Sequence, residues 1–155
     1  MPYFHRKRQR LAYYDYSQQN YYYVTICTWD RRPLFGIGDQ LTAYGQIAKQ
    51  ELEQLPKRYS DITVEKYVIM PNHIHMIVAL GCSQATAKDM PTLSTVIGGY
   101  KSGVSRRIHE QTSDLHIWQK SFYDEIIRGD QHFQQVWNYI DGNPSKWTED
   151  VYFTV

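Results

Sequence analysis

The chain has 155 residues, of which 42% are hydrophobic and 21% are charged. A chain of this length can bury a core without cross-links, so we predict a single domain over residues 1–155. Its two cysteines, Cys27 and Cys82, are too few for a disulfide framework, and they lack the CxxC spacing of a cysteine-rich zinc site. The net charge of +1 argues against a protein that is basic over its whole surface.

No membrane span is expected. No apolar stretch approaches the roughly 20 residues that cross a bilayer, and the polar start MPYFHRKRQR contains no apolar signal-peptide region. We therefore expect a protein of the reducing cytoplasm. Positive charge is nevertheless concentrated in HRKRQR at residues 5–10 and at Lys101, Arg106 and Arg107. Such clusters permit nucleic-acid binding without requiring it, because a merely solvated surface carries the same charges.

A basic, tyrosine-rich leader over residues 1–20 precedes the first regular element. Residues 21–29, YYYVTICTW, are β-branched and aromatic enough to predict a strand, which the segment RRPLFG then ends. Five apolar residues after it recur at helical spacing and predict a helix that stops at Pro56. They are Tyr44, Ile47, Ala48, Leu52 and Leu55. A second strand is predicted at about 62–69.

Pro71 and Asn72 predict a bend between that strand and a third strand over residues 73–80, which is followed by a surface loop. Residues 93–108 have helical apolar spacing and predict a second long helix. Three glycines weaken that prediction, since each costs about 1 kcal/mol relative to alanine in a helix interior. They are Gly98, Gly99 and Gly103.

A fourth strand is predicted over residues 122–128, where FYDEIIR precedes a break at Gly129. A last helix should begin with Asp130 as its N-cap and end near Pro144. The expected order is strand, helix, strand, strand, helix, strand, helix, which is an α+β arrangement.

The third strand opens with two histidines, in the stretch MPNHIHMIVAL at residues 70–80. Because successive side chains of a strand alternate between faces, His73 and His75 should point the same way, opposite to Ile74, Met76 and Val78. Two neutral imidazoles on one face can bind a divalent metal and leave room for substrate oxygens. Two hydrogen-bonded histidines at the edge of a sheet would give the same pattern.

Tyr139 lies outside the apolar stripe of the last helix, on a flank shared with His132, Gln135 and Asn143. An exposed tyrosine beside an asparagine cap would explain it, but a large aromatic side chain off the core stripe is also a candidate functional residue. Tyr139 and Asn143 are one turn apart, which places an amide beside a phenol. The stripe itself consists of Phe133, Val136, Trp137 and Ile140.

Two motifs resemble those of a known family. MPNHIH followed by apolar residues resembles the His-hydrophobic-His motif of the single-tyrosine HUH transposases, and NYIDGNP at 138–144 resembles the motif YIxxNP of the REP-associated tyrosine transposases. The order and spacing of the motifs also agree, over about residues 20–147. The resemblance implies a ferredoxin-like antiparallel sheet with helices packed on it and a C-terminal helix that carries the tyrosine.

The resemblance also implies the chemistry. His73 and His75 would be ligands of Mg²⁺ or Mn²⁺, Tyr139 the nucleophile, and Asn143 the polar ligand one turn beyond it, with His132 or Gln135 as alternatives. Such an enzyme cuts single-stranded DNA beside a hairpin and rejoins it through a 5′-phosphotyrosine. The basic residues would contact phosphates, and they are Arg6, Lys7, Arg8, Arg10, Lys101, Arg106 and Arg107. The sequence leaves open whether the chain acts as a monomer or a homodimer.

Two other classes stay open at this stage. A DNA-binding protein without catalytic activity would keep hairpin binding and form no covalent adduct. A histidine-triad enzyme needs a third histidine at position 77, which is Ile77, and a two-histidine phosphoesterase needs a second His-x-Ser/Thr motif, which is absent from the sequence.

Overall fold

A four-stranded antiparallel sheet organises the computed structural model, in which residues 20–81 and 91–143 are described. The strand order is β4-β5-β1-β6, and every neighbouring pair is antiparallel. The strands are β1 (Asn20–Cys27), β4 (Ile62–Met70), β5 (His73–Leu80) and β6 (Tyr123–Ile126). The two central strands, β5 and β1, thus each pair with a neighbouring strand on both sides.

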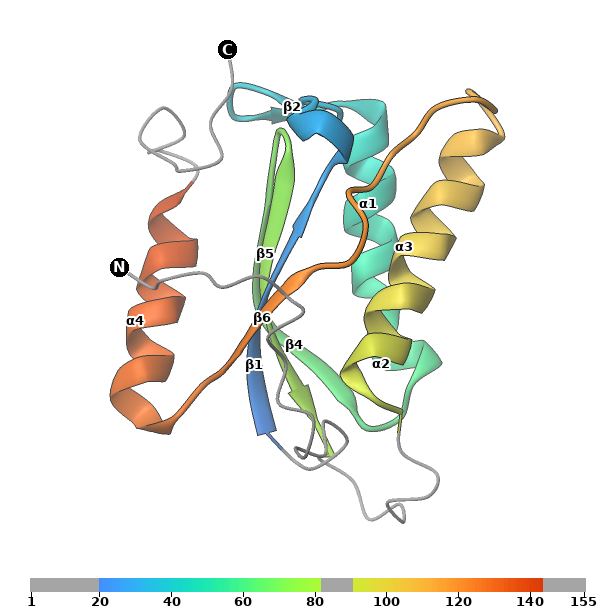
Figure 1. The fold of residues 1–155 in the computed structure, drawn as a ribbon. Helices are drawn as coiled ribbons and strands as arrows, with labels where there is room; N and C mark the ends of the chain where they lie inside the picture. The colour runs from blue at the N-terminus through green and yellow to red at the C-terminus, as the bar shows by residue number, and fades with distance from the viewer. Residues whose placement is uncertain (1–19, 82–90, 144–155) are drawn as a thin grey trace.

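Helices cover both faces of this sheet (Figure 1). On one face lie α1 (Ala43–Glu53), α2 (Leu55–Arg58) and α3 (Leu93–His109), and on the other lies α4 (Gly129–Gly142). Between β1 and α1 the chain forms the short helix η2 (Trp29–Arg31) and the two-stranded ribbon β2 (Gly36–Ile37) and β3 (Gln40–Leu41). The predicted α+β, ferredoxin-like sheet with a C-terminal helix that carries Tyr139 is confirmed.

Two local predictions were wrong. Pro56 does not end α1, which stops at Glu53; it lies in the first turn of α2, where a missing N–H costs no helical hydrogen bond. Asp130 is not the N-cap of α4 but a residue of its first turn, and the cap position is Arg128. Gly129 makes this entry possible with φ +87°, a value that favours glycine.

The sheet separates two apolar clusters. The larger cluster lies under α1 and α3 and takes Ile74, Met76 and Val78 from β5. The smaller lies under α4 and takes Tyr23 and Ile77 from the strands. Each strand therefore contributes alternate residues to different layers, which is why the histidines of β5 face α4.

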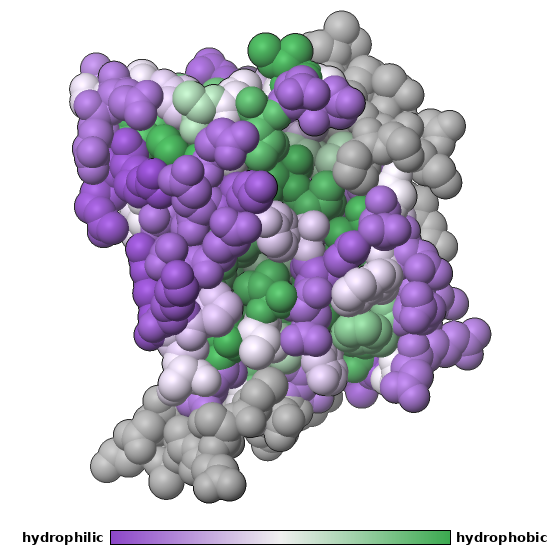
Figure 2. Space-filling view, turned by 180° about the vertical axis from the view of Figure 1, so that it is seen from behind, coloured by the Kyte–Doolittle hydropathy of each residue, from purple (hydrophilic) through white to green (hydrophobic). Residues whose placement is uncertain are grey.

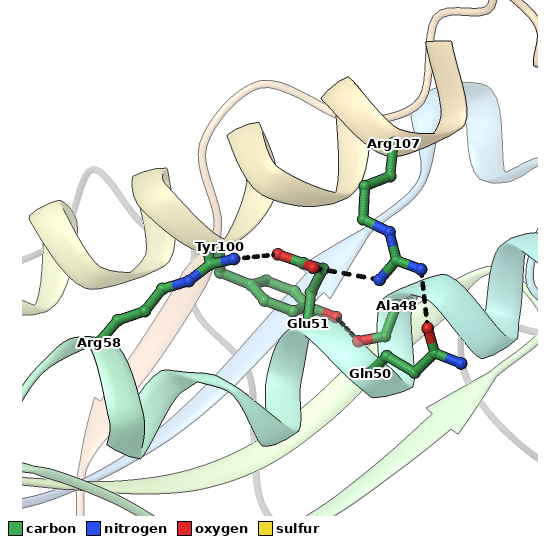
Figure 3. Close-up of polar contacts among 6 residues, drawn as sticks. All are labelled: Ala48, Gln50, Glu51, Arg58, Tyr100 and Arg107. Carbon is green, nitrogen blue, oxygen red and sulfur yellow. Dashed lines mark hydrogen bonds and ion pairs between the residues drawn. The ribbon is translucent and has the colours of Figure 1, made fainter. Parts of the chain in front are cut away.

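A buried carboxylate on α1 links this helix to α2 and α3. Glu51, 5% exposed, forms ion pairs with Arg58 at 2.7 Å and with Arg107 at 3.1 Å (Figure 3). Beside it, the Tyr100 hydroxyl donates to the Ala48 carbonyl at 2.8 Å, and burial raises the pKa of Tyr100 well above its usual value. This network joins α1, α2 and α3 into one layer (Figure 3).

Seen from behind, a band of apolar surface lies between two hydrophilic flanks (Figure 2). Strand β4 is the edge of the sheet opposite to β6, and its apolar side chains are only partly covered by the two clusters. They are Val64, Tyr67, Val68 and Ile69. Over the described residues, no helix is both long and apolar enough to span a membrane.

We predict that Gly103→Ala destabilises the protein. A Cβ at this position would lie 2.6 Å from Glu51 Oε1 and 3.1 Å from an Arg58 guanidinium nitrogen, and Glu51 cannot shift without weakening both ion pairs. The expected loss is about 1–3 kcal/mol in the free energy of unfolding, measured by urea denaturation. Gly98→Ala is the matched control on the same helix, because a Cβ there meets nothing within 4 Å. It should stabilise by up to about 1 kcal/mol, and equal effects of the two substitutions would contradict the packing argument.

Candidate metal and nucleophile site

His73 and His75 lie side by side on the face of β5 that α4 covers. Both side chains are fully buried, and their ring centroids are 4.5 Å apart with an interplanar angle of 70°. The antiparallel pairing with β1 sets Cys27 opposite His73 and Thr25 opposite His75. The predicted convergence of the two imidazoles is therefore what the strand geometry produces.

Asn72 sets the orientation of the His73 ring. Its Oδ1 is 2.8 Å from His73 Nδ1, while its Nδ2 donates to the Arg31 carbonyl at 3.3 Å. The Arg31 carbonyl can only accept, so the amide orientation is determined and Oδ1 must accept from His73. The proton of a neutral His73 therefore sits on Nδ1, and Nε2 carries the lone pair that a metal needs.

His75 is held in the same way by hydroxyl groups of β1. Its Nδ1 lies 2.9 Å from Thr25 Oγ1 and 3.3 Å from the Tyr23 hydroxyl oxygen. Burial, and then the neighbouring His73, lower the pKa of His75 well below its usual value. The ring is thus neutral at physiological pH, which is the form that binds metal.

Tyr139 reaches this pair from α4. Its ring centroid is 5.4 Å from that of His75, at an interplanar angle of 61°. Val136 and Ile140 are the buried residues of the helix and pack against Tyr23 and Ile77, while Tyr139 is only half-buried beside them. Two motifs that are more than 60 residues apart in the sequence meet here.

Ion pairing with the sheet also holds the last turns of α4. Lys66 of β4 binds Asp141 at 2.7 Å, and its ammonium lies 4.7 Å from the centre of the Trp137 ring. These two partners of Lys66, Asp141 and Trp137, lie on either side of Tyr139 in the sequence. The tyrosine is therefore presented from a turn of the helix that β4 anchors from the side.

Three side chains were candidates to complete a metal site. His132 is engaged elsewhere, with Glu125 at 3.3 Å and with the Arg128 backbone N–H at 3.1 Å, and Gln135 is exposed. Asn143 is 3% exposed at the C-cap of α4, one turn beyond Tyr139. Within the described residues, no group of three His, Cys, Asp or Glu side chains could hold a metal. Within residues 20–81 and 91–143, the side chain that could add a further ligand to the two histidines is therefore an amide, that of Asn143.

The residues present fit a divalent ion. Each buried imidazole has its Nδ1 in a hydrogen bond, His73 to Asn72 and His75 to Thr25 of β1. With the Nδ1 proton donated to these partners, Nε2 is the nitrogen of each ring that would bind the ion. Asn143 would add an amide oxygen, and such mixed nitrogen and oxygen sets are compatible with divalent ions.

The basic residues of α3 lie on the opposite side of the sheet from the histidines (Figure 1). Lys101 donates to the carbonyls of Gln119 and Ser121 at 2.9 and 2.8 Å, and burial lowers its pKa to about 8. Arg107 is paired with Glu51, and Arg106 is exposed. The structure thus brings none of the three to the site. The four basic residues predicted in the leader lie outside the described residues.

Three residues of the site were missed by the sequence reasoning, namely Tyr23, Thr25 and Asn72. Tyr23 and Thr25 occupy alternate positions of β1, and only the strand register shows that they face His75. Asn72 could have been found, because an amide directly before the first histidine is a candidate partner for its ring.

Comparison with known proteins identifies the family. The family model described as "Transposase IS200 like" matches residues 16–143. A Haemophilus influenzae protein named "Uncharacterized protein" is 30% identical over 165 residues, covering 94% of this chain and 92% of that protein. Another protein of the same organism, named "Putative REP-associated tyrosine transposase", is 22% identical over 142 residues, covering 85% and 74% of the two chains.

Among solved structures, that of a REP-associated tyrosine transposase bound to a REP hairpin matches with a TM-score of 0.61. The match covers 89% of this chain and 73% of that one at 19% identity, so it supports the fold alone. The family model, in contrast, spans both histidines and the tyrosine. The resemblance read from the two motifs is confirmed, and the chain belongs to the IS200-like transposase family.

Proposed function

We propose that the protein cleaves and rejoins single-stranded DNA beside a hairpin, through a covalent 5′-phosphotyrosine on Tyr139. The observation that carries this proposal is the contact of the Tyr139 ring with His75, itself packed on His73. A nucleophile next to two potential metal ligands suits phosphoryl transfer to a protein side chain, because a metal ion can offset the charge that develops on the phosphate. Family membership supports a transposase role for such a site.

In the proposed reaction the Tyr139 oxygen attacks the scissile phosphorus. The bond from phosphorus to the 3′-oxygen breaks, the phenolic proton passes to that oxygen, and the products are a 5′-phosphotyrosine and a free 3′-hydroxyl. Attack of a 3′-hydroxyl on the phosphotyrosine reverses the step and joins DNA without ATP, because the phosphodiester energy is kept.

His73, His75 and Asn143 would hold Mg²⁺ or Mn²⁺ in this reaction. A bound ion would polarise the phosphate oxygens and offset the charge that develops on them. The chain's own contribution is orientation: Asn72 keeps His73 in one tautomer and Thr25 holds the ring of His75 in place, so little reorganisation is needed when the ligands assemble.

The substrate is inferred from the relatives. The solved structure that resembles this chain is a transposase bound to a REP hairpin, which supports a hairpin next to the cleaved strand as the ligand here. Basic residues outside the site would add affinity by contacting phosphates.

A DNA-binding protein without catalysis is the second candidate, because Tyr139 is half-buried and a phenol buried against aromatic rings can serve packing alone. A denaturing gel of the protein with labelled hairpin DNA separates the two, since only the transposase leaves a covalent band.

Tyr139→Phe should abolish the covalent band and lower cleavage by a factor of about 10⁴ or more, because it removes the nucleophilic oxygen. Folding, metal binding and hairpin affinity should stay close to wild type, since the ring keeps its packing. Single-turnover assays and denaturing gels measure the loss.

Two other tyrosines serve as comparisons in that assay. The Tyr23 hydroxyl also approaches His75, but it does so at Nδ1, whereas the proposed metal site is at Nε2, so Tyr23→Phe should keep the adduct. Tyr100→Phe changes only the opposite layer and should keep it as well. An adduct that survives in Tyr139→Phe and disappears in Tyr23→Phe would assign the nucleophile to β1 instead.

The double variant His73→Ala, His75→Ala should fold and lose binding of one Mn²⁺, measured by calorimetry. The reason is that both predicted imidazole ligands are removed while the core residues on the opposite face of β5 stay in place. Unchanged metal affinity together with normal cleavage would make the pair structural.

Asn72→Ala should lower Mn²⁺ affinity by about 10- to 100-fold, because His73 loses the acceptor that orients its ring. Asn72→Asp keeps an acceptor oxygen and should retain more of the affinity. Equal losses in the two variants would mean that the contact of Asn72 with Arg31, and not the one with His73, is what matters.

A further inference from the structure

Trp29 and His116 form an exposed pair of stacked rings at the end of β1. Their centroids are 4.1 Å apart and the rings are nearly parallel, with an interplanar angle of 6°. Trp29 is 42% exposed, and His116 is exposed as well. An open, flat pair of this kind is unusual for side chains of a core and offers a π-face to solvent.

Backbone hydrogen bonds join the two segments that carry these rings. Trp29 N donates to the Ile117 carbonyl at 2.8 Å, Thr28 and Trp118 form a β-bridge, and Arg32 N donates to the Trp29 carbonyl at 3.1 Å. The segments that carry the rings are therefore fixed before any ligand arrives. Such preorganisation reduces the entropic cost of binding.

The turn that carries Trp29 is strained and charged. Asp30 and Arg31 have backbone φ angles of 53° and 51°, which residues other than glycine rarely adopt. Strain of this kind persists where the surrounding structure imposes it, and it clusters at binding sites. The turn exposes two guanidinium groups, those of Arg31 and Arg32, and one carboxylate, that of Asp30. Its net charge is therefore positive.

Hydrogen bonds connect this turn directly to the metal-binding pair. Thr28 N donates to the Asn72 carbonyl at 3.0 Å, and Asn72 Nδ2 donates to the Arg31 carbonyl. The Thr28 hydroxyl lies between the Arg32 carbonyl at 2.7 Å and the Asn72 carbonyl at 3.1 Å. The same Asn72 side chain accepts from His73. In Figure 1 the short helix η2 accordingly lies beside the β4–β5 hairpin, at the end of the sheet where β5 begins.

We infer that Trp29 and His116 are a stacking platform for an unpaired base of single-stranded DNA, with Arg31 and Arg32 contacting its phosphates. Aromatic faces flanked by positive charge bind single strands in this way without reading sequence. The inference deepens the proposed function, on which it rests, by placing the strand that continues from the cleavage site over η2.

Binding of a fluorescein-labelled oligothymidylate, measured by fluorescence anisotropy, tests the platform without a hairpin. All variants are made in the Tyr139→Phe background, so that no covalent capture contributes. Trp29→Ala should weaken binding about 5- to 150-fold, the range expected when one stacked base is no longer bound. Trp29→Tyr should retain most of the affinity, because the aromatic face remains.

Tyr21→Ala is the matched control. Tyr21 is also an aromatic residue with 42% exposure, but it lies at the other end of β1, in edge contact with Phe133. This variant should bind like the parent protein. Equal losses in Trp29→Ala and Tyr21→Ala, or no loss in Trp29→Ala, would overturn the inference, as would a parent that does not bind oligothymidylate.

Charge and folding are tested separately. Changing Arg31 and Arg32 to Gln should reduce the slope of log affinity against log salt by about 0.7 for each phosphate that the variant no longer neutralises, and an unchanged slope would remove the arginines from the inference.

Thermal melting checks the folding of each variant. If Trp29→Ala does not fold, His116→Ala replaces it, with the same criteria. If Trp29→Ala weakens binding while wild-type protein forms no hairpin adduct, stacking stands and the proposed cleavage fails.

Discussion

The antiparallel pairing of β1 with β5 is the constraint on which the site depends. This register sets Thr25 opposite His75 and Tyr23 opposite Ile77, so the hydroxyl groups of one strand meet the imidazoles of the next. A shift by one residue would turn both histidines into the large cluster under α1 and α3, where a polar ring has no partner of this kind. The large cluster is what makes such a shift costly, because it accepts only the apolar set of β5.

The two layers of the protein have different tasks. Under α1 and α3 the packing is tight, and the buried Glu51 with its two arginines allows the helices to approach only because position 103 is glycine. The layer under α4 has the smaller apolar cluster and mixes polar with apolar side chains, since it contains the histidines, Tyr23 and Tyr139. The rigid layer fixes the strands, and the strands in turn fix the imidazoles.

The sequence was sufficient for the order of the elements because each long element carries its own period. The alternation after Asn72 and the helical stripe around Tyr139 belong to single segments, and both were predicted correctly. What the sequence could not supply was pairing between segments. Tyr23 and Thr25 face His75 only because β1 and β5 are neighbours, and Lys101 is bound by carbonyls of a distant loop. Local charge alone suggested a surface role for Lys101.

The helix that carries Tyr139 is attached to the sheet by few apolar contacts. Among the described residues, its cluster has five buried members, and the chain joins the helix through Gly129, whose backbone is unusually free. The free energy needed to open this helix locally is therefore smaller than that needed to unfold the sheet. If the proposed 5′-phosphotyrosine forms on Tyr139, opening of this helix, with loss of the exposed Lys66–Asp141 ion pair, would move the attached strand away from the histidines while both imidazoles stay in place.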